Sequence, residues 1–347
     1  ESFVLTDDLD LSGIESWTMM DLAASLDGDG HVISGLNLES DKAENLALFN
    51  NISGTISDIT FENVVVSSES YESVKLGIIG ITLTGKISGV TIAESCSVSG
   101  GAATAGAFVA IISGGTVENC TNNAAVTTHT TTDVGATGGI AGEMNNGVIT
   151  DTVNSGDIVG VYRVGGLVGY ATNNVRMSNC QNTAAVTGKN AFTGGIAGRW
   201  AANVNSSASL LKNSGAVTGE DNVGGIFGKI EYSSDYTLNG GYENTGSITG
   251  NNNVGGLFGW SDQSAYKLTI SGDSVNSGDV NGYDYVGGIG GYLRVKYLNI
   301  SGAENTGDVL AENSFAGGIV GYAGGYDYSS IISECTSSAS VSAKFIV

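Results

Sequence analysis

The chain of 347 residues contains no proline, and this absence limits the architectures open to it. Proline lacks a backbone N–H, so strands that hydrogen-bond to neighbours on both edges exclude it from their interior. No apolar run approaches the roughly 20 residues that a membrane-spanning helix requires. We therefore expect a chain of stacked strands that does not insert into a membrane.

Basic residues are scarce: 13 lysines and arginines face 35 acidic residues, for a net charge of −22. Binding of nucleic acid or anionic lipid needs a basic patch. The pair Arg294 and Lys296 is the one local concentration of bases, and the others are scattered along the sequence. We expect this surface to repel nucleic acid, anionic lipid and polyuronate chains, and to be highly soluble or to hold cations.

Cysteine is also rare, with four residues and no Cys-x-x-Cys motif. Cys96 is one of them, and alignment of the repeats described below places the other three in a column of small or apolar residues. Such a column is typical of inward-facing packing, where free cysteine is common. The sequence therefore favours buried thiols over a disulfide or metal framework. The column contains Cys120, Thr152, Cys180, Leu211, Ala303 and Cys335.

A pentapeptide, Gly-Gly-aliphatic-x-Gly, recurs seven times at intervals of 27 to 32 residues. Degenerate copies lie upstream as GAFVA from Gly106, LGIIG from Leu76 and LALFN from Leu46. A period of 20–50 residues is the signature of a solenoid. The seven copies begin at Gly138, Gly165, Gly194, Gly224, Gly255, Gly287 and Gly317.

A second block follows each pentapeptide: Asn, a small polar residue, Gly or Ala, a variable residue, then Val or Ile. The glycine suits a turn with positive φ, and the branched residue suits a buried strand. Asparagines one coil apart can hydrogen-bond in a ladder along the corner. We favour this structural role over a row of ligand contacts for Asn122, Asn154, Asn182, Asn213, Asn244, Asn276 and Asn305.

Each repeat supplies about three short strands between tight corners, without a helical period. Stacking such units predicts an all-β protein, a right-handed parallel β-helix of about ten coils. We assign residues 1–45 to an N-terminal cap and first coil, and 46–347 to the repeat coils of the same domain. Trp17–Leu26 is predicted to form a capping helix over the exposed strand edge. The end from Ser340 has no comparable cap, so we expect further domains of the same polypeptide there.

The glycine motif followed by NSGxV resembles the GLUG repeat of bacterial surface proteins. The opening LTDDLDLSG from Leu5 and LDGDGHVISGL from Leu26 is similar to the entry of such β-helices, so the resemblance covers roughly residues 5–343. It implies a secreted or cell-surface bacterial protein. The zinc peptidases that carry such repeats need His-Glu-x-x-His. The histidines here are His31 and His129, so that activity does not transfer.

Length variation collects between each glycine pair and the next asparagine, and this arc carries most of the aromatic residues. In repeat proteins such insertions often form the binding face. Aromatic rings beside acids and amides suit stacking on sugars or contact with a partner protein. The alternative is that the rings only cover a sheet. The candidate ligand-binding residues are Tyr170, Trp200, Tyr232, Tyr236, Trp260, Tyr266, Tyr292, Tyr297 and Tyr322.

Cofactor chemistry has little support in the sequence. The acidic N-terminal segment is a candidate Ca²⁺ site, but its spacing matches no EF-hand loop and reads first as tight turns. His31 belongs to that turn. We expect no cofactor and no catalytic residue. The acidic segment comprises Asp7, Asp8, Asp10, Asp27 and Asp29.

The sequence favours a non-enzymatic, adhesin-like β-helix that binds glycan or a host protein along its aromatic arc. A carbohydrate-active enzyme, a polysaccharide lyase or glycosidase, is the alternative from another class, because a glycosidase needs two carboxylates on one face. A passive structural spacer is the third reading. Carboxylates on or near the arc are Asp235, Asp262, Asp284 and Asp327.

Overall fold

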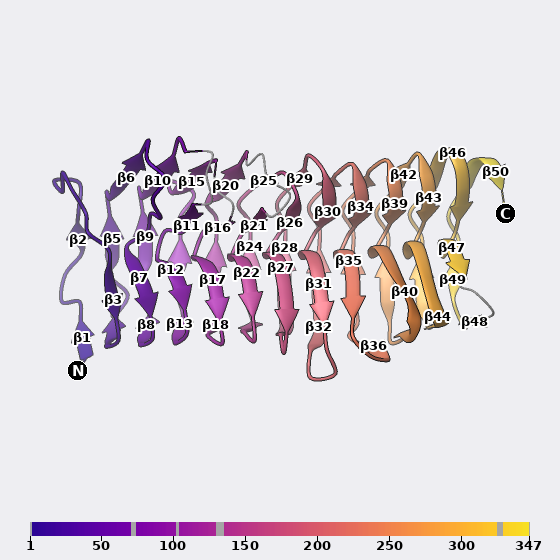
Figure 1. Ribbon diagram of the computed structural model, residues 1–347, viewed down its shortest axis with the longest axis horizontal. Coiled ribbons are helices and arrows are strands. Elements are labelled where there is room, and N and C mark those ends of the chain that lie inside the picture. Colours follow the sequence, from indigo (N-terminus) through magenta and orange to yellow (C-terminus); the bar gives the residue numbers. More distant parts are fainter. Residues whose placement is uncertain (1, 71–73, 102–103, 130–134, 325–328, 347) are drawn as a thin grey trace.

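The computed structural model describes residues 2–70, 74–101, 104–129, 135–324 and 329–346. These residues form a parallel β-solenoid of about ten turns, with 61% of residues in strands and no helix. The coils stack along one axis, and the two termini lie at opposite ends of an elongated rod (Figure 1). Three parallel sheets, here called A, B and C, run along this axis.

Sheet A carries the asparagine ladder and contains 18 strands in two adjacent rows. Every pairing within it is between successive coils. Its strands are β1 (Ser2–Val4), β2 (Leu9–Asp10), β4 (Ser25–Asp27), β5 (Val32–Ser34), β8 (Thr55–Ser57), β9 (Thr60–Glu62), β13 (Lys86–Ser88), β14 (Thr91–Ile92), β18 (Thr116–Glu118), β19 (Thr121–Asn122), β23 (Val148–Thr150), β24 (Val153–Asn154), β28 (Arg176–Asn182), β32 (Ser207–Asn213), β37 (Glu243–Asn244), β41 (Ser274–Asn276), β45 (Ala303–Asn305) and β49 (Thr336–Ser337).

Sheet C follows the asparagine corner in each coil and leads into the glycine pair. It also has two rows, joined at the long strand β46. Its strands are β6 (Asn37–Ser40), β10 (Val65–Ser68), β11 (Lys75–Leu76), β15 (Ser97–Gly100), β16 (Thr104–Gly106), β20 (Ala125–Thr128), β21 (Ala136–Gly138), β25 (Ile158–Gly160), β26 (Arg163–Gly165), β29 (Val186–Gly188), β30 (Ala191–Gly194), β33 (Val217–Thr218), β34 (Asp221–Gly224), β38 (Ile248–Thr249), β39 (Asn252–Gly255), β42 (Val280–Gly282), β43 (Asp284–Gly287), β46 (Val309–Gly317) and β50 (Val341–Ile346).

Sheet B follows the glycine pair, and its strands lengthen toward the C-terminus. The insertions noted in the sequence extend these strands and the turns into sheet A. Its strands are β3 (Met20–Leu22), β7 (Phe49–Ile52), β12 (Gly80–Leu83), β17 (Val109–Ser113), β22 (Ala141–Asn145), β27 (Val168–Asn173), β31 (Ala197–Ala202), β35 (Phe227–Tyr232), β36 (Tyr236–Leu238), β40 (Phe258–Ile270), β44 (Gly290–Ser301), β47 (Val320–Gly324) and β48 (Ser330–Ser333).

The interior of the rod is a continuous apolar core. The aliphatic residue of each pentapeptide points inward, as the repeat predicts, and from Ile140 to Ile289 it is fully buried. The branched residue after the asparagine block is buried too, as at Ile158 and Val217. Burial of stacked Ile, Leu and Val columns is the dominant favourable contribution to such a fold.

The seven asparagines form one buried hydrogen-bonded ladder. Each Nδ2 donates to the Oδ1 of the next asparagine at 2.7–2.8 Å, from Asn122 to Asn305. The same Nδ2 donates to the backbone carbonyl two residues on, for example Asn213 to Gly215 at 2.8 Å. Buried amides are therefore satisfied along the whole corner, which avoids the cost of unpaired polar groups.

The second glycine of each pair is required by this ladder. A Cβ at Gly195 would lie 2.4 Å from the amide carbon of Asn213, and the five equivalent positions give 2.3–2.5 Å. Contacts this short do not occur between real atoms, so only glycine fits beside the asparagine. The glycine pair and the asparagine block are thus two halves of one packing unit.

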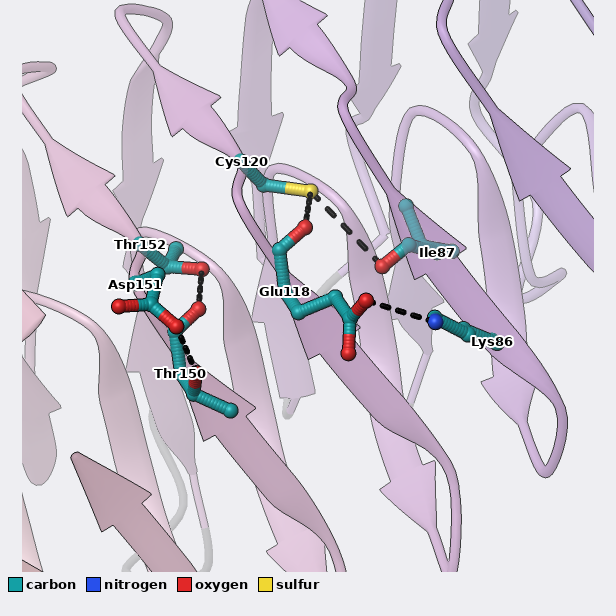
Figure 2. A network of polar contacts seen from close by, with 7 residues as sticks. All are labelled: Lys86, Ile87, Glu118, Cys120, Thr150, Asp151 and Thr152. Atoms are coloured by element: carbon teal, nitrogen blue, oxygen red, sulfur yellow. Dashed lines mark hydrogen bonds and ion pairs between the residues drawn. The ribbon is translucent and has the colours of Figure 1, made fainter. Parts of the chain in front are cut away.

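The cysteine column behaves as the aligned repeats predict. Cys120 Sγ donates to the carbonyls of Glu118 and Ile87, and Thr152 in the next coil donates its hydroxyl to the Thr150 carbonyl at 2.8 Å (Figure 2). Burial raises the pKa of the Cys120 and Cys180 thiols to about 12. All four cysteines are free, and Cys335 is the only one that is partly exposed.

Three local predictions are wrong. Trp17–Leu26 forms no helix: Met20–Leu22 is a strand of sheet B paired with β7, because stacking on the next coil outweighs local helix propensity. The degenerate copy that the sequence places from Leu76 is shifted by one residue. Strand pairing aligns Leu76 with Ala105, and therefore Gly77 with Gly106.

The glycine of the asparagine block has no positive φ. It is needed because a Cβ at Gly215 would lie 1.8 Å from the carbonyl oxygen of Ala184 in the preceding coil. The positive-φ turns use mainly Asn and Asp instead, as at Asn119 and Asp151.

Candidate functional site

The outer face of sheet B carries a single column of side chains along the rod. Strand register aligns the residue after each pentapeptide with its counterpart in the next coil. All members are at least partly exposed, so the column faces outward. In order, the column reads Asn51, Thr82, Ile111, Glu143, Tyr170, Arg199, Lys229, Trp260, Tyr292 and Tyr322.

A second column joins this face from the adjoining corner of sheet C, two residues before each glycine pair. It contains Arg163, Phe192, Tyr285 and Phe315, with asparagines between them. Phe192 and Tyr285 have φ of 66° and 53°, a strained conformation for large side chains that directs their rings onto the neighbouring column. Together with Tyr162, the two columns form what we call the aromatic stripe: Tyr162, Arg163, Tyr170, Phe192, Arg199, Lys229, Trp260, Tyr285, Tyr292, Phe315 and Tyr322.

In the first part of the stripe, cations lie against aromatic rings. The guanidinium carbons of Arg163 and Arg199 both lie 4.8 Å from the centre of the Tyr170 ring. Further along, Lys229 Nζ lies 4.6 Å from the Trp260 ring and 5.1 Å from the Phe192 ring. Cation–π contacts of this length are favourable and order the rings on the surface.

The second part of the stripe is a purely aromatic cluster. Tyr292 and Tyr322 stack at 4.6 Å with an interplanar angle of 9°. Tyr285 meets both edge-on and stacks on Phe315 at 5.5 Å. Burial raises the pKa of the Tyr292 hydroxyl, so it stays protonated and able to donate a hydrogen bond at physiological pH.

Two arginine–carboxylate pairs flank the stripe. Arg199 donates through Nε and Nη2 to Glu231 Oε2, with the Nε contact at 2.8 Å. Arg294 forms a two-point pair with Asp262, at 2.9 and 2.7 Å. Pairs of this geometry hold both partners charged and fix their orientation. Lys229 Nζ lies 3.6 Å from Glu231, while burial lowers the Lys229 pKa.

Three predicted ligand-binding residues lie in the core instead. Trp200 is fully buried, and Tyr232 and Tyr236 are 4% and 6% exposed. Trp200 Nε1 donates to the Tyr236 hydroxyl at 3.3 Å and its ring stacks on Phe227 at 5.0 Å. Side chains alternate along a strand, so Trp200 points inward because Arg199 points outward. These three side chains are part of the buried core, so a ligand on the outer face of sheet B cannot contact them.

The remaining candidates lie on the surface. Tyr170, Trp260, Tyr292 and Tyr322 belong to the stripe. Tyr266 is half-buried, 6.1 Å from the Tyr232 ring, and Tyr297 is 44% exposed with Lys296 Nζ 5.4 Å from its ring. Both lie beyond the stripe, toward sheet A.

The expectation that basic residues are scattered is wrong for this face. Arg163, Arg199 and Lys229 are far apart in sequence but meet around Tyr170, Phe192 and Trp260. The sequence held a signal for the missed members Arg163, Phe192, Tyr285 and Phe315, because each stands two residues before a glycine pair. Register between coils was needed to show that this position shares a face with the predicted column.

The carboxylates near the arc are engaged as acceptors. Asp262 pairs with Arg294, Asp235 accepts the Lys267 backbone N–H at 2.8 Å, and Asp284 accepts from Asn313 at 3.0 Å. Asp327 lies outside the described residues. A glycosidase needs one protonated carboxyl opposite a second carboxylate. Each of the three described carboxylates is instead engaged by a guanidinium, a backbone N–H or a side-chain amide.

The acidic N-terminal residues serve turns. Asp8 accepts from the Val32 N–H at 2.9 Å and lies 3.1 Å from His31 Nδ1, and these contacts lower the Asp8 pKa. Asp10 and Asp27 each accept the backbone N–H two residues on. Within the described ranges, no three His, Cys, Asp or Glu side chains group as metal ligands. The described residues also contain no helix that is long and apolar enough to cross a bilayer.

Comparison with known proteins places the repeat in a known class. The GLUG motif matches residues 160–187 and 313–342. No curated protein matches the chain. One solved structure with a similar fold is a "putative immunoglobulin A1 protease from Bacteroides ovatus", with 18% identity and a TM-score of 0.42 over 85% of this chain and 78% of that one. The chain is thus a parallel β-solenoid with two GLUG motifs, a repeat typical of bacterial extracellular proteins.

Proposed function

We propose that this chain is a non-enzymatic, adhesin-like module of a secreted or cell-surface bacterial protein, and that it binds glycan along the aromatic stripe. The observation that carries the proposal is the stripe itself. The rings of Tyr170, Trp260, Tyr292 and Tyr322 share a single partly exposed column on a rigid sheet, with Arg199 and Lys229 between the first two. Sugar rings stack on such platforms, and an extended glycan fits a linear array.

The rigidity of the platform supports this function. The rings of Tyr170, Trp260 and Tyr292 stand on strands that pair with both neighbouring coils, and Tyr322 stands on β47, which pairs with β44. Phe227 and Phe258 pack in the core below the column. Functional groups fixed by the scaffold lose little conformational entropy on binding. The ordered stack of Tyr292 on Tyr322 is an example of a surface already arranged before any ligand arrives.

The arrangement of carboxylates favours binding over hydrolysis. Glu231 and Asp262 are neighbours on adjacent strands of sheet B, yet each is held by its own arginine. An arginine partner occupies carboxylate oxygens that a catalytic pair would have to present to the glycosidic bond. Carboxylates held in this way are better suited to ordering the face than to cleaving a glycosidic bond.

A glycan panel scored for both binding and released sugar tests the proposal. We expect binding without turnover, and the Trp260→Ala variant to bind about tenfold or more weakly because a stacking platform is worth roughly 1–3 kcal/mol. Phe3→Ala is the matched control, since Phe3 is an exposed ring at the far end of the rod.

Release of sugar that persists in purified protein and disappears in Asp262→Asn would contradict the non-enzymatic role. Equal binding by wild type and Trp260→Ala would move the site away from the stripe. A panel without any binding, at millimolar glycan, would favour a spacer or a protein-binding module instead.

A further inference from the structure

The chemistry of the stripe also specifies the kind of glycan, an inference that rests on the proposed function. We propose that the first part of the stripe recognises a sugar carboxylate, as carried by sialic or uronic acids in a sparsely charged glycan. The acidic group contacts Arg163, Arg199 and Lys229, while neighbouring sugar rings lie on the adjacent aromatic rings.

The geometry supplies a cationic cradle between aromatic platforms. Two guanidinium groups approach the same Tyr170 ring at 4.8 Å, one from sheet C and one from the next coil of sheet B. Lys229 is the next residue of the outward column, 4.6 Å from the Trp260 ring. A ligand that follows the rod therefore passes the Tyr170 ring, then the cations Arg199 and Lys229, then the Trp260 ring.

The local charge reverses that of the molecule. In the whole chain acidic residues outnumber basic ones, 35 to 13. Along this part of the face four cations, Arg163, Arg199, Lys229 and Arg294, lie with three carboxylates. The carboxylates are Glu143, Glu231 and Asp262. Cations collected against the prevailing charge, on the face that also holds the rings, indicate an anionic ligand at this place.

Donor geometry favours a carboxylate. A guanidinium has five N–H donors in a planar fork that matches a carboxylate. Glu231 Oε2 accepts from Nε and Nη2 of Arg199, so a ligand carboxylate is contacted by the opposite, Nη1 side of this guanidinium. Lys229, whose charge is disfavoured by burial, gains an additional counter-charge when an anion binds.

The net charge of −22 determines the density of ligand charge that the site accepts. A chain with one phosphate or sulfate at every unit meets repulsion from the surrounding acids over a Debye length of about 8 Å at physiological salt. A glycan with one carboxylate among neutral sugars is attracted by the local cations and carries little further charge for the surrounding acids to repel. This favours a sparsely acidic glycan over a nucleic acid, although both offer rings and anions.

Matched ligands separate this inference from the proposed function. Sialyllactose is compared with lactose, and short hyaluronan oligosaccharides with their methyl-esterified form, by calorimetry on the whole chain. We expect the carboxylated member of at least one pair to bind about tenfold more tightly, the size expected of a charge-assisted contact. Preference in the first pair identifies sialic acid as the source of the carboxylate, and preference in the second identifies uronic acid.

Variants locate the carboxylate. Arg163→Gln, and Arg163→Gln with Arg199→Gln, are expected to lose most of the preference while keeping the binding of neutral sugar that depends on Trp260. Lys86→Gln is the control: it removes one cation from sheet A, where Lys86 pairs with Glu118 at 2.6 Å. Circular dichroism and thermal melting verify the fold, and the single variant keeps the test valid if loss of the Glu231 partner unfolds the double one.

Three outcomes would overturn the inference. Equal affinity for both members of each pair would leave glycan binding intact but remove the carboxylate preference. A preference that both arginine variants retain would place the acidic group elsewhere. Tighter binding of oligo(dT) than of either acidic glycan would assign the face to single-stranded nucleic acid. Absence of binding to any sugar would instead contradict the proposed function itself.

Discussion

The coils before Asn122 and those after it follow the same backbone path but differ at two positions in every turn. At the corner of sheet A, Ile33, Phe61 and Ile92 occupy the column that asparagine takes from Asn122 to Asn305. On the outside of sheet B, Asn51, Thr82 and Ile111 occupy the column that later carries tyrosine, tryptophan and cations. The core positions between them stay aliphatic throughout.

This difference separates the requirements of the fold from those of the surface. An apolar corner and an amide ladder both close the coil, so the ladder is one of two structural solutions, and it requires glycine beside it. The change on the outer face has no such structural need, because Thr82 and Tyr170 stand on equivalent backbone. We therefore propose that the aromatic stripe serves binding, whereas the asparagine ladder closes the coil.

The largest expected effect is on the core column that both regions share. Ile226→Ala should reduce the free energy of unfolding by roughly 2–5 kcal/mol, the usual cost of a buried aliphatic truncation. Ile79→Ala, at the same column position in the N-terminal region, should cost a similar amount because both side chains are fully buried. Urea unfolding of the two variants measures this, and a cost confined to one region would mean that the two cores are not equivalent.

The second prediction replaces one asparagine of the ladder with the residue type found at the apolar corner of the N-terminal coils. Asn213→Ile introduces the residue that Ile92 provides in the N-terminal region, but it removes the acceptor of Asn182 and the donors to Asn244 and Gly215. Each buried group left unpaired costs about 1–3 kcal/mol, so this variant should be clearly less stable than wild type. Ile92→Val at the apolar corner is the control, and equal stability of the two variants would contradict the structural role of the ladder.

Alkaline titration should test the cysteine column within the coils after Asn122. The folded state holds the Cys180 thiol protonated to a pKa of about 12, whereas a thiol in the unfolded chain titrates near about 8.5. Above that lower value the unfolded state loses its proton first, so stability falls with rising pH by up to about 1.4 kcal/mol per pH unit.

Cys180→Thr, which copies Thr152 of the same column, should keep the fold and weaken this fall between pH 8 and 10. The measurement is urea unfolding across that range, below the pH at which the buried tyrosines contribute. Thr152→Ser is the control without a titrating group. An unchanged pH dependence in Cys180→Thr would show that this thiol titrates alike in the folded and unfolded states.

The smallest effect on stability is expected on the outer face. Tyr292→Ala and Thr82→Ala alter partly exposed side chains at equivalent positions of the outward column, and each should change the free energy of unfolding by about 1 kcal/mol or less. Only Tyr292→Ala should weaken glycan binding. Comparable losses of binding in both would show that the affinity does not reside in the rings.

Sequence patterns predict most of the fold because its determinants repeat. The glycine pair, the asparagine block and the inward aliphatic residue identify the corners and the core of each coil. Local reasoning fails at the N-terminus, where pairing of Met20 with Phe49 decides the structure of a segment with helical composition. It also fails at Gly215, where glycine is required because the Ala184 carbonyl of the preceding coil lies too close for a Cβ. No single repeat contains this contact.

The binding face is less predictable because it combines separate columns. Strand alternation alone could have assigned Trp200 to the core, since it directly follows the outward Arg199. The approach of Arg163 and Phe192 to the Tyr170 and Trp260 column depends on the coil register and on the positive φ of Phe192. These are properties of the stacked structure rather than of a motif.

Tryptophan fluorescence during glycan titration tests the central claim most directly. Of the three tryptophans, Trp200 is fully buried and Trp17 donates to the Leu48 carbonyl at 2.8 Å, so Trp260 is the reporter on the stripe. The account predicts a saturable change in emission on binding of an acidic glycan, absent in Trp260→Phe, which keeps an aromatic ring. Binding with the same emission change in wild type and Trp260→Phe would contradict it, because the ligand would then lie away from the stripe.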